Sequence, residues 1–245
     1  MSPRQIVVVG AGGFAREVAW LIRDINRENN GYEFVGYVVS DLSRLKEHDS
    51  RTEVLGDFGW LESHHGRVDA LALGIGIPSD RLKLSAELET RFPWIEWPAL
   101  VHPSVRFDRD SCSVGRGVIV CAGVIGTVNV VFEPFVMVNL ACTIGHEARL
   151  GRGCVLNPTV NISGGVTLGE GVLVGTGAQI LQYVQVGARA TIGAGAVVTK
   201  NVPAGETVVG VPAKPLKIRH RQEAESWQSN CHKSDSIRHT SEQMG

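Results

Sequence analysis

Two adjacent residues, His146 and Glu147, interrupt a stretch that is otherwise rich in small and branched apolar residues. A histidine can take up a proton near neutral pH because its unperturbed pKa is about 6.5. A neighbouring carboxylate favours the imidazolium and so makes the neutral ring a stronger base. The pair therefore has the composition of a general base that could activate an amine or a hydroxyl. The alternative is an ordinary pair of surface side chains.

The chain that holds this pair repeats itself every six residues, as a search for internal repeats shows. From Val114 to Val198, every sixth residue is bulky and apolar except Gly126. From Cys112 to Ala196, every sixth residue is Val, Ala or Cys. The pattern is typical of a triangular parallel β-helix with three short strands in each 18-residue coil. Its coils bury their apolar walls only by stacking on one another.

The residues before the repeat predict a small parallel α/β unit. We expect buried strands at 5–10, 32–39 and 68–76, and helices at 11–26 and 79–92, the second with Ser79 as its N-cap. Gly12 and Gly13 belong to a G-x-G-x-x-A sequence between the first strand and helix, where backbone N–H groups favour a diphosphate. A tight turn without a ligand is the alternative. Asp41, just past the second strand, could accept a hydrogen bond from a ribose or base.

Three prolines within residues 93–105 mark a boundary between the two parts. We expect an α/β domain at 1–98, a β-helix domain at 99–217 and a polar tail at 218–245 that is a short helix or disordered. Residues 201–217 do not follow the six-residue repeat, and we expect them to cover the exposed strand edge of the last coil. About 98 residues are too few for a full dinucleotide domain with a substrate domain, so a nicotinamide dehydrogenase fits poorly.

Composition excludes several partners. With a net charge of −1 and 20% charged residues, the sequence does not indicate a basic surface that would bind nucleic acid. The repeat accounts for the long apolar stretches better than a membrane span does, and the apolar run near residue 6 is too short for a signal peptide. The five cysteines form no C-x-x-C pair, which predicts free thiols in a reducing, cytoplasmic setting. Cys112, Cys142 and Cys154 fall on small interior positions of the repeat, so we expect them to pack in the core.

The segments VVGAGGFAREV, LALGIGIPSDR, GHEARLGRGCVLNPTVNISGGVTLG and GVPAKP together make residues 4–217 similar to the sialic-acid and bacillosamine acetyltransferase family (PglD/NeuD-like). The resemblance implies an α/β half-Rossmann domain followed by a left-handed parallel β-helix of hexapeptide repeats. It implies acetyl-CoA as co-substrate and a homotrimer with active sites between neighbouring β-helices. The expected activity is N-acetylation of a nucleotide-linked amino-deoxysugar. Sugar O-acetylation and nucleotide-sugar binding without catalysis are the alternatives.

The resemblance also assigns roles to single residues. His146 corresponds to the general base and Glu147 to the carboxylate that raises its basicity. The residues implied to contact the nucleotide sugar are Gly12, Gly13, Phe14, Asp41, Gly74 and Asn139, the last of them at the amine. Many members carry a histidine at the positions of Phe14 and Val155, so this chain departs from the family in its substrate loop and near its coenzyme.

Coil geometry provides a second route to the site. Residues 18 apart stack at about 4.8 Å, which places Gly164 above His146 and Gly165 above Glu147. We expect this layer to leave room for a reacting group and to expose backbone N–H groups that could stabilise a thioester oxyanion. A simple tight corner is the alternative. With the cysteines facing the core, we expect direct transfer to the acceptor without an acyl-enzyme.

Coenzyme A is long, so its contacts should recur every 18 residues along the β-helix. One such column holds Pro158, Thr176, Ala194 and Pro212. The candidate coenzyme contacts are Gly164, Thr176 and Ala194, and the family resemblance adds Val155. Lys200, Lys214 and Lys217 could meet the phosphates, with ordinary solvated lysines as the alternative. No metal is expected. A zinc carbonic anhydrase needs three histidine ligands, whereas residues 101–217 contain only His102 and His146.

Overall fold

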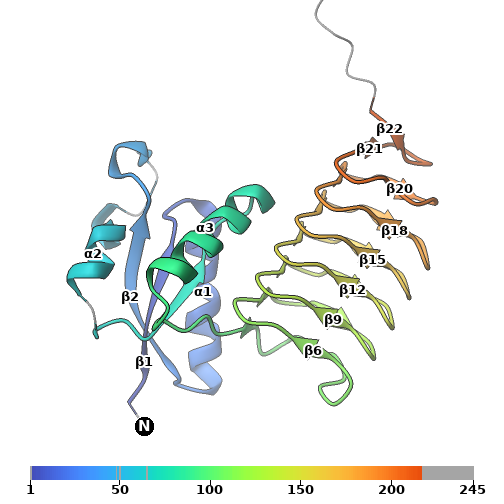
Figure 1. The fold of residues 1–245 in the computed structure, drawn as a ribbon. Helices are drawn as coiled ribbons and strands as arrows, with labels where there is room; N and C mark the ends of the chain where they lie inside the picture. The colour runs from blue at the N-terminus through green and yellow to red at the C-terminus, as the bar shows by residue number, and fades with distance from the viewer. Residues whose placement is uncertain (1, 48, 50, 65, 217–245) are drawn as a thin grey trace, which may run out of the picture. The chain divides into compact units, whose positions relative to one another are not determined.

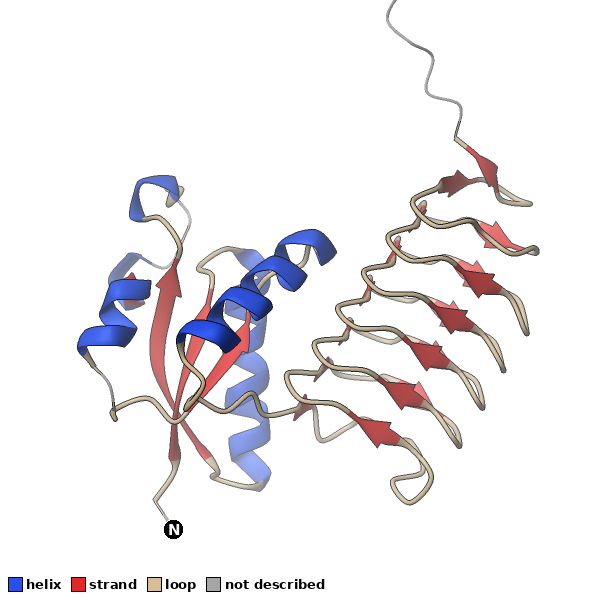
Figure 2. Cartoon of the chain, in the orientation of Figure 1, coloured by secondary structure: helices blue, strands red, loops and turns tan. Residues whose placement is uncertain are grey.

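The computed structural model describes residues 2–47, 49, 51–64 and 66–216, so the predicted tail at 218–245 and Lys217 lie outside the described residues. The first part is a parallel sheet with strand order β3-β2-β1-β4. Figure 2 shows these strands flanked by helices. In chain order the elements are β1 (Arg4–Val9), α1 (Gly13–Glu28), β2 (Tyr32–Val39), two 3₁₀ turns (Leu42–Arg44 and Arg51–Glu53), β3 (Val54–Asp57), α2 (Phe58–Ser63), β4 (Ala70–Leu73) and α3 (Pro78–Arg91).

The alternation of side chains along β1 builds a core on each face of this sheet. Ile6 and Val8 are buried with residues of α1, whereas Val7 and Val9 are buried with residues of α2 and α3. The predicted parallel α/β unit is therefore confirmed. The sequence did not reveal β3 and α2, because β3 is a four-residue edge strand with no buried residue and α2 has six residues.

The predicted N-cap of α3 is wrong. Ile77 is the N-cap and Pro78 stands at the first helical position, so Ser79 lies inside the first turn. Proline suits that position because its fixed φ matches the helix and its missing N–H would have no partner there. Gly12 is the N-cap of α1, and it offers no side chain to the first turn.

The second part is a left-handed parallel β-helix whose stacked coils are visible in Figure 1. We call its three sheets walls A, B and C. Wall A holds β5 (Leu100–Val101), β7 (Ile119–Val120), β10 (Met137–Val138), β13 (Val155–Leu156), β16 (Leu173–Val174), β19 (Thr191–Ile192) and β21 (Thr207–Val209). Wall B holds β8 (Ile125–Gly126), β11 (Thr143–Ile144), β14 (Asn161–Ile162), β17 (Gln179–Ile180) and β20 (Val197–Val198). Wall C holds β6 (Ser113–Val114), β9 (Val131–Phe132), β12 (Arg149–Leu150), β15 (Thr167–Leu168) and β18 (Gln185–Val186). The last strand of the described chain, β22 (Lys214–Pro215), follows β21 and is not part of wall C.

Both columns of the six-residue repeat form the core of this β-helix. Every bulky position from Val120 to Val198 and every small position from Val118 to Ala196 is buried. The glycines that follow bulky positions have a structural reason, since a Cβ at Gly145 or Gly175 would stand 2.5 Å from a backbone nitrogen of the next coil. Cys142 and Cys154 are buried free thiols, as expected, and Cys112 is half-buried.

The 18-residue step ends after β20, whose Val197 still pairs with Gln179 of β17. Val208 pairs with Ile192 and Val202 bridges to Val186, each 16 residues later in the chain. β21 thereby pairs with the exposed strand edge of the last regular coil. Because the step is two residues shorter here, Pro212 does not continue the column of Pro158, Thr176 and Ala194, which corrects that part of the prediction.

The two parts share a core within residues 1–214, which form one compact unit. Leu100, Ile119, Met137 and Val155 of wall A are buried together with residues of β1 and α1. The fully buried Arg81 of α3 donates hydrogen bonds to the carbonyls of Phe135 at 3.0 Å, Leu73 at 3.1 Å and Ile75 at 2.7 Å. Burial lowers its pKa to about 9.

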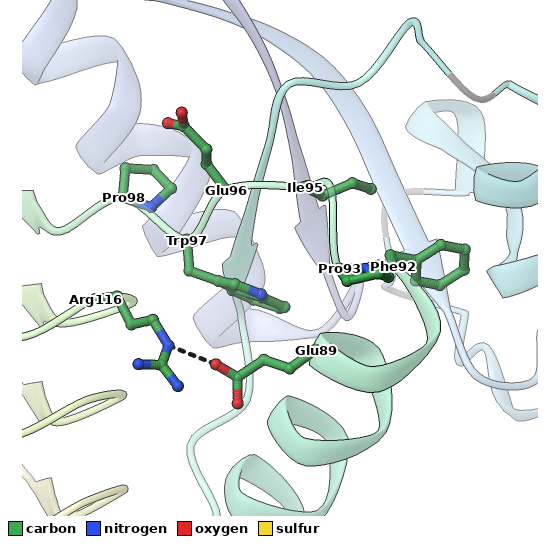
Figure 3. A pocket seen from close by; sticks show the side chains of 8 residues that line it. All are labelled: Glu89, Phe92, Pro93, Ile95, Glu96, Trp97, Pro98 and Arg116. Atoms are coloured by element: carbon green, nitrogen blue, oxygen red, sulfur yellow. Dashed lines mark hydrogen bonds and ion pairs between the residues drawn. The ribbon is translucent and has the colours of Figure 1, made fainter.

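A carboxylate of α3 adds a second link to the β-helix. Glu89 accepts from Arg116 at 2.5 Å, as Figure 3 shows, and from Arg152 at 2.9 Å. The Glu89–Arg116 pair borders a hollow of about 440 Å³ whose other side chains include Phe92, Trp97 and Pro98. Among the described residues, no helix is long and apolar enough to cross a membrane.

Candidate functional site

His146 and Glu147 lie at a corner of the β-helix, where the chain passes from β11 in wall B to β12 in wall C. Every sixth residue from Gly117 to Gly195 takes a positive φ at these corners, and Glu147, with φ 54°, is one of them. This conformation turns the two side chains outward. The imidazole is 52% exposed and the carboxylate 54% exposed, so the candidate base faces the outside of the β-helix rather than its core.

The carboxylate of Glu147 is held from two sides. The Nδ1–H of His146 donates to one oxygen, and the side-chain amide of Asn129 donates to the other at 3.3 Å. These two hydrogen bonds hold the pKa of Glu147 below its ordinary value. With Nδ1 engaged as a donor, the lone pair of the neutral ring lies on Nε2. The arrangement leaves Nε2 as the atom that can accept a proton.

The glycine layer above this pair differs from our expectation of open room. A Cβ on Gly164 would stand 2.5 Å from both Cε1 and Nε2 of His146, so the imidazole fills the space of the missing side chain. A Cβ on Gly165 would overlap ring carbons Cδ1 and Cε1 of Tyr183 in the same way. The two glycines therefore let two rings lie against the backbone of one coil.

Only one of the two glycines has an N–H without a hydrogen-bond acceptor among the described residues. Gly165 N–H donates to the carbonyl of His146 at 2.7 Å, and the carbonyl of Gly164 accepts from Tyr183 N–H at 3.0 Å. The N–H of Gly164 donates to no acceptor in the described part of the chain. Gly164 is thus the one residue of the pair whose N–H could meet a developing oxyanion.

A second candidate region lies at the carboxyl ends of β1 and β2. A hollow of about 200 Å³ is lined there by residues that include Gly10, Asp41, Arg44 and Ile75. The exposed Asp41 accepts hydrogen bonds from the backbone and hydroxyl of Ser43, which lower its pKa. Its carboxylate is therefore ionised at the rim of this hollow.

The glycines near that hollow differ in what they do. A Cβ on Gly12 would meet nothing within 4 Å and one on Gly13 only Arg16 Nη2 at 3.9 Å, so packing does not require either glycine. A Cβ on Gly74 would stand 2.6 Å from that of Ala15 in α1. Packing of α1 on β4 thus explains Gly74 without a ligand. Phe14 is half-buried against the α1 side of the core.

The candidate coenzyme contacts do not gather at the His146 corner. Thr176 and Ala194 are exposed and stack with Pro158 at the corner between walls A and B. The N–H of Gly177 donates to the Pro158 carbonyl, and the N–H of Gly195 donates to the Thr176 carbonyl. Lys200 and Lys214 are exposed. Val155 is fully buried in the core shared with α1, which argues against a coenzyme contact in this chain. Asn139 is buried too, and its side-chain oxygen accepts from Leu140 N–H at 2.8 Å.

Sequence analysis missed Asn129 and Tyr183. Asn129 precedes Glu147 by one coil and Tyr183 follows it by two, so the 18-residue spacing that pointed to Gly165 would also have found them. No cluster of three or more metal-ligating side chains occurs among the residues that the structure describes. His102, the other histidine of the β-helix, pairs with Asp24 of α1 at 3.3 Å and not with the His146 corner.

Comparison with known families matches both parts of the chain. Residues 5–88 match the PglD N-terminal domain, and residues 165–200 match the bacterial transferase hexapeptide (six repeats). No curated protein sequence matches.

Several solved structures resemble the chain over most of its length. The acetyltransferase domain of PglB from Neisseria gonorrhoeae FA1090, in complex with acetyl coenzyme A, is 30% identical, with 87% of this chain and 100% of that one covered and a TM-score of 0.77. PerB from Caulobacter crescentus, in complex with CoA and GDP-perosamine, is 29% identical, with 87% and 97% covered and a TM-score of 0.76. WeeI from Acinetobacter baumannii AYE is 27% identical, with 87% and 100% covered and a TM-score of 0.73.

Proposed function

Because the chain belongs to the PglD-like family of hexapeptide-repeat sugar acetyltransferases, we propose that it transfers an acetyl group from acetyl-CoA to the amino group of a nucleotide-linked amino-deoxysugar. Two relatives support this reaction. One was solved with acetyl coenzyme A and the other with CoA and GDP-perosamine. The observation within this chain that carries the proposal is the Asn129–Glu147–His146 arrangement, which leaves Nε2 free to take a proton.

His146 acts as the general base in this proposal. The neutral amine attacks the thioester carbonyl carbon, and Nε2 of His146 takes the proton that the nitrogen loses as the C–N bond forms. Glu147 stabilises the imidazolium that results, because its carboxylate accepts the Nδ1–H hydrogen bond. Asn129 is a positioning residue, since it acts on the imidazole only through Glu147.

Collapse of the tetrahedral intermediate completes the transfer. The carbonyl oxygen becomes negative as the amine adds, and the Gly164 N–H is the donor proposed to stabilise it. The C–S bond then breaks, and the CoA thiolate takes the proton held by the imidazolium. The products are the acetamido sugar and free CoA, and His146 returns to its neutral form. Cys121, Cys142 and Cys154 take no part in this proposal, because their thiols are buried.

The active site is proposed to lie between protomers of a homotrimer. The α/β part of a chain covers wall A of its own β-helix from β5 to β16. His146 lies at the corner between walls B and C, which is the corner opposite wall A in a three-walled prism. A nucleotide sugar held near Gly12, Gly13 and Asp41 of one protomer would therefore present its amine to the His146 corner of a neighbour.

A thiol-release assay tests the activity. Purified protein is supplied with acetyl-CoA and, one at a time, UDP-, GDP- and dTDP-linked amino sugars, and mass spectrometry with NMR locates the new acetyl group. We expect CoA release with at least one amino sugar and acetylation on nitrogen. Acetylation on a hydroxyl would replace this proposal with O-acetylation. Tight sugar-nucleotide binding without CoA release would indicate a binding protein instead.

A further inference from the structure

Tyr183 presents the largest exposed ring near the candidate base. Its residue is 70% exposed, and it follows β17 at a corner between walls B and C. This is the corner that holds Glu147 two coils earlier, so the ring and the base lie on one edge of the β-helix. The neighbouring Leu181 is also 40% exposed.

The backbone at Tyr183 makes that exposure costly. Its φ is 61°, a conformation that bulky residues rarely take, and half of the equivalent corner positions from Gly117 to Gly195 are glycine. Phe135 occupies an equivalent position with φ 62°, but its ring is fully buried and packs on Trp97. Burial compensates the cost at Phe135. At Tyr183 the ring covers Gly165 on one side, but the residue stays 70% exposed.

The contacts of Tyr183 join it to the base. Its ring lies in the space that Gly165 leaves free, while the imidazole of His146 lies in the space of the adjacent Gly164. Its backbone N–H donates to the Gly164 carbonyl at 3.0 Å. Neighbouring coils are about 4.8 Å apart, which is close to the width of a sugar ring. The Tyr183 ring lies over Gly165, one coil from Glu147, so a sugar whose amine reaches Nε2 of His146 is wide enough to reach the ring.

We propose that Tyr183 is a specificity-determining residue whose ring packs against the pyranose of the acceptor sugar. The C–H face of a deoxysugar is apolar, so an aromatic ring can desolvate it and hold the sugar in the site. The proposal rests on the proposed function and adds a contact on the acceptor side of the same site. It predicts that loss of the ring weakens the acceptor and leaves the donor unaffected.

Steady-state kinetics with the preferred amino sugar test this contact. Tyr183→Asn removes the ring at a position where asparagine tolerates a positive φ, so the fold is kept. We expect its KM for the sugar nucleotide to rise about tenfold, the effect of one aromatic contact. Its KM for acetyl-CoA and its kcat should change less than about threefold. Tyr183→Phe, the matched control, should keep the wild-type KM for the sugar.

Two results would overturn the inference. One is an unchanged KM for the sugar nucleotide in Tyr183→Asn. The other is a rise in the KM for acetyl-CoA, which would assign the ring to the donor. Calorimetry separates this test from the proposed function, because it measures binding of the sugar nucleotide without turnover. If the wild-type protein releases no CoA but Tyr183→Asn binds the sugar nucleotide more weakly, the proposed activity is wrong and the proposed sugar contact of Tyr183 stands.

Discussion

The imidazole of His146 rests on the backbone of Gly164, in the space where any other residue would carry its Cβ. One coil separates the two residues in sequence, and the stacking of β11 on β14 brings them together. The absence of a side chain at Gly164 therefore sets the position of the proposed base. The same glycine carries the N–H proposed to meet the oxyanion.

Gly164→Ala should displace the base without unfolding the coil. The new Cβ would stand 2.5 Å from Cε1 and Nε2 of a half-exposed ring that can swing outward. A misplacement on the order of 1 Å costs about 100-fold in rate, so we expect kcat to fall by that amount with little change in melting temperature. The double variant with His146→Ala should be no slower than His146→Ala alone. Additive losses would show that Gly164 acts independently of the ring.

Asn129→Gly should slow the reaction more modestly. Glycine tolerates the φ of 57° at this position, so the variant removes the hydrogen bond to Glu147 without strain. One hydrogen bond of this kind corresponds to a loss of about 2- to 10-fold in kcat/KM. Asn129→Asp, which sets a second carboxylate beside Glu147, should lose more. Equal rates for all three proteins would remove Asn129 from the site.

The buried cysteines should resist alkylation. Burial raises the pKa of Cys121 and Cys154 to about 12 and that of Cys142 to about 11, so these thiols stay protonated at pH 8. The thiolate is the reactive form. Peptide mapping after iodoacetamide treatment at pH 8 should find none of the three labelled in the native protein and all three labelled in urea. Rapid native labelling of Cys142 or Cys154 would contradict the packed core.

Stability should depend on Glu89 in acid. Partial burial raises the pKa of Glu89, but hydrogen bonds from Arg116 and Arg152 outweigh that effect and hold the pKa below its ordinary value. A carboxyl with a lowered native pKa stabilises the fold above its unfolded pKa, and this contribution is lost as the pH falls through the native value. Wild type should therefore melt higher than Glu89→Gln at pH 7, and the gap should close below about pH 4. A gap of constant size would show that ionisation of Glu89 is irrelevant.

Most of the fold follows from periodicity. The step of six places Leu156, Val160 and Ile162 in the core whatever their neighbours are, because each wall needs one bulky and one small residue per strand. The same spacing correctly stacked Gly164 on His146. The prediction failed after β20, where the step shortens to 16 residues, because the closing segment has no repeat that would fix its register.

Other features depend on tertiary contacts that leave no pattern in the sequence. Arg81 is fully buried and bonds three carbonyls, although its position in an amphipathic helix looks like any surface arginine. Val155 and Asn139 are buried for a related reason, since the α/β part covers wall A and packs near the corner beside it. A repeat predicts which side chains face inward, but not which outer wall another domain covers.

The most direct test of the account is the kcat of His146→Ala with acetyl-CoA and the amino sugar that wild type prefers, measured on protein whose melting temperature matches wild type. Loss of a general base predicts a fall of at least about 100-fold. Full activity in this variant would contradict the central claim that the His146 imidazole takes the proton from the acceptor amine.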